Sequence, residues 1–377
     1  MPKYTVIIYT PQELNHSSFI QTGLFELEKM GFVEVKVKLD IHKNLGRYIV
    51  SDDKHCNETK QAYPKVSLYK LIDNTTQKNI LFATDLYDFA NQFSKAALEK
   101  CDVVFKRNYE TEFVEKLPTI HQKKLRKLGL SFGVHSNHKR YDKLFFIGLM
   151  LSNFNVNYKW DRFLIKRINN TYIKQRSHWN FISTTRKISR FESLNKGTDN
   201  TILFQTRCFL REDQQDVINI HEQRHHIIKL LRKHFSNQFL GGFIPSKIAN
   251  EKYADALSNV PSEPELYLDA LKKAKIVIYT RGLANSPAWK MAEYCSQGKI
   301  IIAERLTTEL PVPLEHGKEL LFFDTDEELV ENIKLVLTDE SLGNDLSVNA
   351  RRYFEKHIHP AQSVKRILDI MITKLDN

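Results

Sequence analysis

The clearest candidate site lies in residues 276–304, IVIYTRGLANSPAWKMAEYCSQGKIIIAE. An apolar strand precedes a loop and then a helix, and Ser286, directly before a proline, suits the N-cap of that helix. Helix N-termini bind anions, and Arg281 and Lys290 would add positive charge beside this one. Glu293, further along the helix, could accept hydrogen bonds from two ribose hydroxyls. The pattern predicts a site for a phosphorylated nucleoside, although an ordinary strand–helix crossover with surface charges shows the same pattern.

The first half of the chain offers candidates for a second substrate. Asp85 follows the apolar run NILFAT at the carboxyl end of a predicted strand, where parallel sheets place ligand-binding groups. It could act as a general base on an acceptor hydroxyl in an inverting reaction, or it could cap the next helix. His135, in SFGVHSNHK, could line the same cleft or lie in a polar loop.

A family resemblance adds to this interpretation. The segment SPAWKMAEYCSQGKIIIAE, with HGKELLFFDTDEELVENIKLVL after it, resembles the donor-binding C-terminal domain of GT-B glycosyltransferases of the family 1 and family 4 type. Many retaining members carry two glutamates, the second followed by four residues, a glycine and a strand. Glu293, Gly298 and KIIIAE reproduce that ending, whereas the first glutamate would fall at Asn285. The resemblance covers roughly residues 200–355 and implies that Glu293 binds the donor ribose.

The resemblance also implies where the donor diphosphate would bind. Members of this fold often place basic residues just after the first strand of the C-terminal domain, and here QTRCFLRED offers Arg207 and Arg211. Gly241 and Gly242, in FLGGF, could let the backbone approach the donor, or they could form a tight turn.

Two short motifs raise the question of a metal ion. His221-Glu222-Gln223-Arg224-His225 has the HExxH spacing of zinc proteases, but we favour a solvated helix face. Asp324-Thr325-Asp326 is similar to the metal-binding DxD of another glycosyltransferase fold, but a helix N-cap with acidic residues in the first turn explains it better. Because GT-B enzymes generally catalyse without a metal ion, we expect no metal and no cofactor besides the nucleotide-sugar co-substrate.

These candidates need an α/β scaffold to position them. Strand and helix signals alternate from residue 3 to about 106 and start again at TILFQT, which predicts mostly parallel sheets. We expect two Rossmann-like domains that face each other across a cleft, the GT-B arrangement. Residues 1–197 would form the acceptor-side domain and residues 198–377 the donor domain, with the last helix able to pack back on the first.

The charge of this 377-residue chain, +11 overall, is unevenly distributed. Residues 1–200 hold 33 Lys and Arg against 20 Asp and Glu, and residues 201–377 hold 23 against 25. The segment 121–190 alone has 16 against 2, interleaved with aromatic residues. It could be a solvated surface, an acidic-membrane contact or a nucleic-acid site, and the absence of any nucleic-acid-binding signature ranks the third last.

The function that we expect is transfer of a sugar from a nucleotide-sugar donor to a glycan or lipid-linked acceptor, in bacterial surface polysaccharide assembly such as capsule or lipopolysaccharide. The four cysteines are far apart and no long apolar segment occurs, which fits a cytoplasmic enzyme, with peripheral attachment to the inner face of the membrane left open. The alternatives are a sugar-nucleotide epimerase of the same fold and a nucleic-acid-binding protein that uses the basic half.

Overall fold

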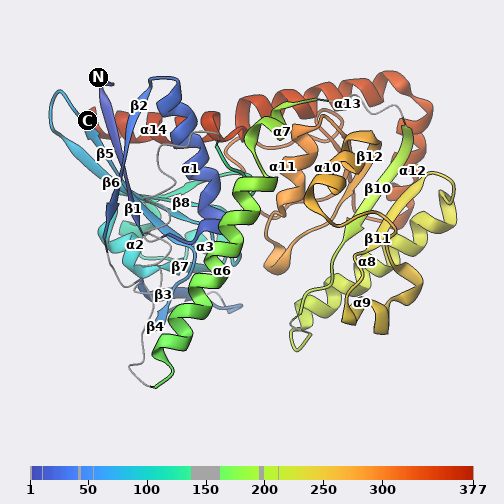
Figure 1. The fold of residues 1–377 in the computed structure, drawn as a ribbon, viewed down its shortest axis with the longest axis horizontal. Coiled ribbons are helices and arrows are strands. Elements are labelled where there is room, and N and C mark those ends of the chain that lie inside the picture. Colours follow the sequence, from blue (N-terminus) through green and yellow to red (C-terminus); the bar gives the residue numbers. More distant parts are fainter. Residues whose placement is uncertain are drawn as a thin grey trace. The chain divides into compact units, whose positions relative to one another are not determined.

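The computed structural model describes residues 2–10, 12–40, 44–53, 55–136, 162–194, 199–210 and 212–376. The chain divides into two compact units, shown in Figure 1. Unit 1 comprises Met1–Ser189, Thr308–Val312 and Ile358–Asn377, and unit 2 comprises Arg190–Thr307 and Pro313–His357. Residues 137–161 of the basic aromatic segment lie outside the described residues.

The first boundary lies a few residues before the predicted one, at Ser189 instead of residue 197. Hydrogen bonds explain the difference, because they tie the segment after Ser189 to unit 2. The main-chain oxygen of Phe191 accepts from Gln297 and Arg351, and Arg351 also donates to Glu192. The polar stretch NKGTDN, in which we placed the boundary, follows these contacts.

Unit 1 is built on a six-stranded sheet with the order β2-β1-β5-β6-β8-β9. Its strands are β1 (Tyr4–Thr10), β2 (Val33–Leu39), β5 (Val66–Asp73), β6 (Asn79–Asp85), β8 (Val103–Lys106) and β9 (Leu125–Lys127). Only β5 runs antiparallel to its neighbours, so the expected mostly parallel sheet is a mixed one. The short turn between β5 and β6, in which Asp73 accepts from Thr75 and Thr76, allows a hairpin but no crossover.

A second, three-stranded sheet of unit 1 was not predicted. Its order is β4-β3-β7, formed by β3 (Leu45–Val50), β4 (Cys56–Ala62) and β7 (Gln92–Ser94). The strand β4, CNETKQA, carries too few apolar residues to be recognised by hydropathy, and all of its residues are half-buried or exposed.

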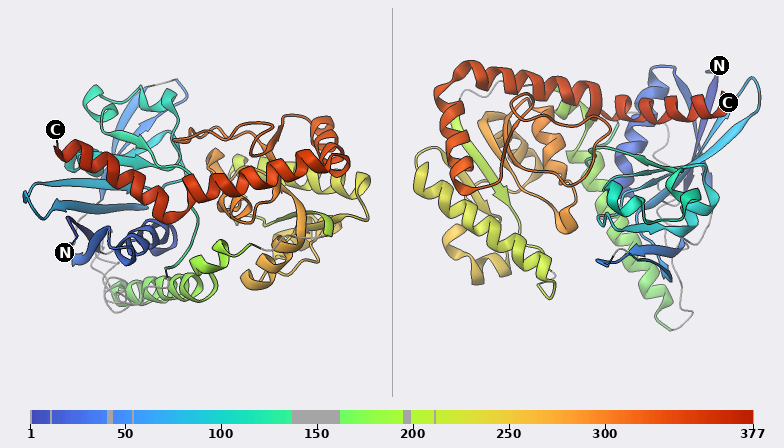
Figure 2. Two further views of the ribbon diagram at one scale, coloured as in Figure 1. Left: turned by 90° about the horizontal axis from the view of Figure 1, so that it is seen from above. Right: turned by 180° about the vertical axis from the view of Figure 1, so that it is seen from behind.

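The helices of unit 1 are α1 (Leu14–Lys29), α2 (Lys95–Lys100), α3 (Thr111–Val114), α4 (Thr119–Gln122), α6 (Leu164–Thr185) and the C-terminal α14 (Pro360–Asp376), with α7 (Ile188–Glu192) at the boundary. The last helix, α14, packs against α1, and Figure 2 shows the two side by side. Gly23 makes this approach possible, because a Cβ there would lie 2.4 Å from the main-chain oxygen of Pro360.

Unit 2 contains a wholly parallel sheet with the order β11-β10-β12-β13-β14. Its strands are β10 (Asp199–Thr206), β11 (Phe239–Phe243), β12 (Ala274–Tyr279), β13 (Ile300–Glu304) and β14 (Leu321–Phe323). The chain passes from β10 outward to β11 and then returns to the other side of β10 for β12, which is the doubly wound topology predicted for this half.

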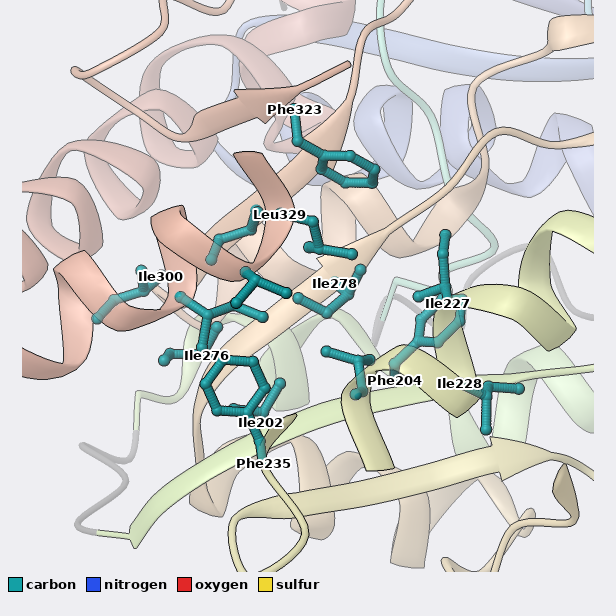
Figure 3. Close-up of a cluster of buried hydrophobic side chains, with 14 of the residues drawn as sticks. Ile202, Phe204, Ile227, Ile228, Phe235, Ile276, Ile278, Ile300, Phe323 and Leu329 are labelled. Atoms are coloured by element: carbon teal, nitrogen blue, oxygen red, sulfur yellow. The ribbon is translucent and has the colours of Figure 1, made fainter. Parts of the chain in front are cut away.

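Helices cover both faces of the unit 2 sheet. They are α8 (Gln215–His234), α9 (Lys247–Lys252), α10 (Pro264–Lys273), α11 (Trp289–Ser296), α12 (Asp326–Thr338) and α13 (Glu340–Tyr353), with short helical turns η3 (Ala254–Ala256), η4 (Leu283–Asn285) and η5 (Phe354–Ile358). Figure 3 shows Ile202, Ile276 and Ile278 of the sheet packed with Ile227 of α8 and Leu329 of α12. The neighbouring residues along each strand face the other side, toward α10 and α11, which explains the continuous apolar runs.

The Asp-Thr-Asp motif forms the N-terminus of α12. Thr325 is the N-cap, its hydroxyl accepts from the N–H of Glu328, and three acidic residues fill the first turn. The prediction of a capped helix is confirmed. None of the helices that the structure describes is long and apolar enough to cross a membrane.

Candidate functional site

The carboxyl edge of the unit 2 sheet gathers most of the residues predicted to bind the donor. The strands β10 and β12 are neighbours in this sheet although β11 lies between them in the sequence. At such a topological switch point the loops that follow the two strands lead away from each other, and doubly wound sheets bind ligands in the space that this leaves. Arg207 follows β10 and Arg281 follows β12, so these two predicted basic residues lie in the two loops that border the switch point.

The loop that carries Arg281 is fixed from two sides. The guanidinium of Arg281 pairs with Asp216, in the first turn of α8, at 2.6 Å. Asp216 also accepts from the N–H of Ala284 at 2.8 Å, and Glu304 accepts from the N–H of Arg281 at 2.8 Å. Ala284 and Asn285 both have left-handed backbone, at φ 51° and 54°. Because such a conformation is unfavourable for non-glycine residues, these contacts hold a strained loop in one shape.

Ser286 does not have the role that its position in the sequence predicts. The helix α11 begins at Trp289 with Ala288 as N-cap, and the N–H of Ala288 donates to the hydroxyl of Tyr279 at 2.9 Å. Ser286 is buried, and its main-chain oxygen accepts from Gly282. The predicted N-cap is therefore wrong, because the helical turn at 283–285 shifts the N-cap by two residues, to Ala288.

Lys290 and Glu293 lie on α11, close to the end of β10. The ammonium of Lys290, half-buried, donates to the main-chain oxygen of Gln205 and lies 5.0 Å from the centre of the Tyr267 ring. Burial lowers the pKa of Lys290 to about 7, and the positive charge of nearby arginines acts in the same direction, whereas Glu293 opposes it. Glu293 itself is 6% exposed. An ammonium so perturbed beside a ligand edge would be fully charged once an anion binds.

Gly241 and Gly242 have a structural reason in this chain. Both have positive φ, at 125° and 134°. A Cβ on Gly241 would lie 2.2 Å from the main-chain oxygen of Phe204, and one on Gly242 would lie 2.4 Å from that of Ala256. The glycines therefore let the edge strand β11 pack closely on its neighbours, and a contact with the donor stays a prediction.

Arg207 is exposed, with its guanidinium 5.7 Å from the centre of the Phe209 ring. Arg211, the other arginine predicted to hold the diphosphate, lies outside the described residues. The loop that carries them is attached to α8 by His221, whose Nε2 accepts from the N–H of Phe209 at 2.8 Å. His221 is 1% exposed, so the predicted solvated face is wrong at this residue. Burial lowers the pKa of His221, as does the charge of Arg224, which keeps its ring neutral and able to accept.

The HExxH spacing thus has another explanation. While His221 accepts from the main chain, His225 shares a hydrogen bond with Asp255 at 2.9 Å. Within the described ranges, no group of three or more His, Cys, Asp or Glu side chains is arranged to hold a metal ion.

Arg224, between these two histidines, was missed by the sequence analysis. It is 5% exposed and donates to the main-chain oxygens of Arg207 and Arg281, at 3.0 and 3.1 Å. A signal was available, because Arg224 stands in the apolar stripe of α8, four residues after Ile220 and four before Ile228. A charged residue at a core position needs specific partners.

In unit 1, Asp85 is enclosed in a buried ion pair. It is 1% exposed, and its carboxylate accepts from Lys106 at 3.3 Å and from the Tyr63 hydroxyl at 2.8 Å. Lys106, with no exposed surface, also donates to the main-chain oxygens of Phe89 and Gln92. A carboxylate so enclosed cannot reach an acceptor hydroxyl, which corrects the interpretation of Asp85 as a general base. It does not cap a helix either.

His135 lies in a small, mostly apolar pocket between α1 and α6. Its ring meets that of Trp179 edge to face, with 5.0 Å between the centres, and its backbone forms a bridge with Lys187. His135 is half-buried there, which differs from both the cleft lining and the polar loop that the sequence allowed. Nothing in this arrangement brings His135 near Asp85.

Polar side chains other than Asp85 and His135 are partly exposed at the carboxyl edge of the unit 1 sheet. Asp88 pairs with Lys65 at 2.6 Å and with Arg107. Burial opposes ionisation of Asp88, but these two cations outweigh it and hold its pKa below the usual value. His16, in the first turn of α1, lies 3.3 Å from the ammonium of Lys65, which directly precedes β5. Its ring also lies 3.0 Å from the carboxylate of Glu13, the N-cap of α1. This cluster follows the carboxyl ends of β1, β6 and β8; the sequence placed Asp88 and Arg107 at two of these strand ends, whereas His16 and Lys65 were not predicted.

A known family matches the carboxy-terminal part of the chain. Residues 224–369 match the family model described as glycosyl transferase-like. The carboxy-terminal part of this chain is thus similar to that family. The resemblance predicted from the SPAW…IIIAE segment is thereby confirmed for this part of the sequence, which includes Arg281, Lys290 and Glu293. No curated protein sequence matches the chain.

Solved structures resemble the chain only distantly. TarM of S. aureus matches 100% of this chain and 99% of its own at 10% identity and TM-score 0.40. Anabaena Alr3699/HepE, crystallised with UDP-glucose, matches 98% and 100% at 9% identity and TM-score 0.38. The UDP-GlcNAc 2-epimerase of Neisseria meningitidis matches 75% of this chain at 14% identity and TM-score 0.35, and the chain spans 64% of that protein. At these scores the matches carry no argument about substrate or activity.

Proposed function

We propose that this protein is a glycosyltransferase that moves a sugar from a nucleotide-sugar donor to a glycan or lipid-linked acceptor. The observation that supports this most strongly is the group of cations at the switch point of the unit 2 sheet. Arg207, Arg281 and Lys290 follow or face the ends of two adjacent parallel strands, and Arg281 and Lys290 lie within the residues that match the glycosyl transferase-like family. Positive charge at this edge suits the diphosphate of a sugar donor.

The proposed chemistry is electrostatic. As the sugar leaves, negative charge grows on the nucleotide diphosphate, and Arg207 and Lys290 would stabilise that charge more than they stabilise the bound donor. Because Lys290 is half-buried beside Tyr267, its charge would act in surroundings that screen it weakly. Glu293, about one turn into α11, would accept from the ribose hydroxyls and orient the donor.

The donor-site proposal is tested by binding and turnover. Wild-type protein is screened by thermal shift against nucleoside diphosphates and nucleotide sugars, and release of the nucleotide is then measured with candidate glycan acceptors. We expect one nucleoside to stabilise the protein, and Glu293→Gln to remove most of that shift. Glu331→Gln, at an exposed site on α12, is the matched control and should keep it. Failure of every nucleotide at millimolar concentration would overturn the proposal.

We further propose that the acceptor side uses an acidic membrane surface, as a lipid-linked acceptor in surface polysaccharide assembly would require. The helix α6 supports this, because its 22 residues include four basic and no acidic side chains. Ile165 and Ile173 are 81% and 56% exposed on it, and each directly precedes an exposed lysine, Lys166 and Lys174. Basic side chains beside exposed apolar ones favour contact with anionic lipid.

Sedimentation with vesicles tests the membrane proposal. Wild-type protein should sediment with phosphatidylglycerol vesicles and stay in solution with phosphatidylcholine vesicles. Lys166→Glu with Lys174→Glu should abolish the binding, whereas Lys233→Glu with Lys334→Glu, a change of equal charge at exposed sites of unit 2, should preserve it. Equal losses in both double variants would show that net charge alone matters and would contradict a role for α6.

A further inference from the structure

Arg224 is a buried guanidinium that joins the two loops that border the switch point. It projects from α8 and reaches the first main-chain oxygen after β10, that of Arg207, with one terminal nitrogen. Its other terminal nitrogen reaches the oxygen of Arg281, just after β12. The pairing of β10 with β12 ends earlier, at Leu203 and Val277, so no strand pairing links the two loops at Arg207 and Arg281. The arginine therefore replaces the missing sheet hydrogen bonds by a clamp between the loops.

The charge of Arg224 has no anionic partner in the part of the chain that the structure describes. No described carboxylate lies within 4.0 Å of its nitrogens, and its Nε, which is buried, has no acceptor. Its surroundings include the positive charges of Arg207 and Arg281 and the ring of Phe209, 5.1 Å from the guanidinium carbon. Burial lowers the pKa of Arg224 to about 10, and the two arginines act in the same direction.

A buried charge without a counter-ion is costly, and the cost rises when its neighbours have the same sign. The two hydrogen bonds to main-chain oxygens do not by themselves require a positive charge, because a neutral donor can also bind a main-chain oxygen. A multiply charged anion at the strand ends would relieve the repulsion and complete the site. An unpaired guanidinium, an unsatisfied N–H and two further arginines at one ligand edge all indicate the same kind of ligand.

We propose that Arg224 is a positioning residue of a pyrophosphate-binding site at the β10–β12 switch point, where it holds both loops in their binding geometry and leaves a positive charge for the ligand to neutralise. The inference rests on the proposed function in that the pyrophosphate would belong to the sugar donor. Arg224 acts through the loops of Arg207 and Arg281, and it need not touch the transferred sugar.

The same helix provides a matched control. Arg232, two turns after Arg224, also donates to two main-chain oxygens, those of Asp255 and Leu257. It is half-buried and holds residues 255–257, which adjoin the end of the edge strand β11, without contacting the main-chain oxygens that follow β10 and β12. Arg224→Lys and Arg232→Lys thus each keep the charge and remove one pair of hydrogen bonds to main-chain oxygens, and they differ in burial and in which loops they hold.

The experiment measures inorganic pyrophosphate binding by isothermal titration calorimetry, with the melting temperature of each unliganded protein alongside. We expect Arg224→Lys to weaken binding by about tenfold or more, because a lysine cannot span both loops. Arg232→Lys should bind within about twofold of wild type, whatever its effect on the melting temperature. Equal affinities in the two variants, or no pyrophosphate binding by the wild type, would overturn the inference.

Hydrogen–deuterium exchange of the wild type keeps the test decisive if Arg224→Lys does not fold. Pyrophosphate should slow exchange in both loops, residues 207–210 and 281–286, and leave residues 255–257 unchanged. Protection of one loop only, or of neither, would contradict a clamp that serves the ligand. Turnover of nucleotide sugars separates the two proposals. Pyrophosphate binding that depends on Arg224, without any sugar transfer, would support the pyrophosphate site and refute the proposed glycosyltransferase activity. Sugar transfer that is unchanged in Arg224→Lys would support the activity and refute the role of Arg224.

Discussion

The pKa of Lys290 predicts a pH dependence of donor binding that a simple charge count would miss. In the unliganded protein burial lowers this pKa from 10.5 to about 7, so the ammonium is about half deprotonated at neutral pH. A diphosphate beside it would favour the charged form and return the pKa toward 10.5. Binding must then be accompanied by proton uptake at Lys290, and the affinity must fall as the pH rises through 7.

The size of the effect follows from linkage. With a pKa of about 7 in the free protein and one near 10.5 in the complex, affinity falls by about tenfold between pH 6 and pH 8. Proton uptake should be roughly 0.1 per site at pH 6, about 0.5 at pH 7 and about 0.9 at pH 8. The sign is fixed, since the group gains a proton in the complex and binding is strongest where the proton is already present.

The assay is calorimetric titration, in two buffers of different ionisation enthalpy at each pH, with the nucleoside diphosphate that binds most tightly. Lys290→Arg is the control, because an arginine stays charged throughout and any remaining pH dependence belongs to the ligand. Lys290→Met should bind at least about tenfold more weakly than the wild type at pH 6 and much more like it above pH 8. Identical pH profiles for the wild type and Lys290→Arg would refute the assignment of Lys290 to the diphosphate.

Three further predictions concern residues whose roles the structure revises. Lys106→Met should lower the free energy of unfolding by about 3–5 kcal/mol, since it strands the Asp85 carboxylate in the core; urea denaturation followed by circular dichroism measures this, and a variant as stable as wild type would contradict the buried pair. Gly241→Ala should lose about 1–3 kcal/mol or more, because φ is +125° and its Cβ would meet the β10 backbone; unchanged melting with lost nucleotide binding would instead support a donor contact. The urea midpoint should fall as the pH drops below about 6.5, where the unfolded chain takes up a proton that buried His221 resists, and the slope should lessen in His221→Gln.

Much of the donor-side fold could be predicted from the sequence, for a physical reason. Strands covered on both faces, such as KIVIY and KIIIA, read as continuous apolar runs, and the intervening helices repeat apolar residues every three to four positions. The hairpin of β5 and β6 and the small sheet with β4 were not predicted. Their signals depend on the length of one turn and on a strand with little apolar character.

The candidate residues were predictable by type and position, but their contacts were not. Placing Arg207, Arg281 and Lys290 at strand ends needs only the order of elements. Whether a carboxylate at a strand end is open or buried depends on residues far away in the sequence, and Tyr63 and Lys106 enclose Asp85 from two other strands or loops. The role of Arg224 likewise depends on loops that follow two different strands.

The distribution of charge shows why local pairing is a better guide to an anion site than composition. The first half of the chain carries the excess of basic residues, yet at the edge of its sheet Lys65, Lys106 and Arg107 all pair with aspartates. In the second half acidic residues slightly outnumber basic ones, and Arg281 is paired with Asp216, yet no described carboxylate lies within 4.0 Å of the nitrogens of buried Arg224 or half-buried Lys290. Basic groups already neutralised by the protein gain little from a ligand, whereas buried ones without a partner gain most. The second half of the chain, which has the lower net charge, is therefore the half in which an anion would bind most favourably.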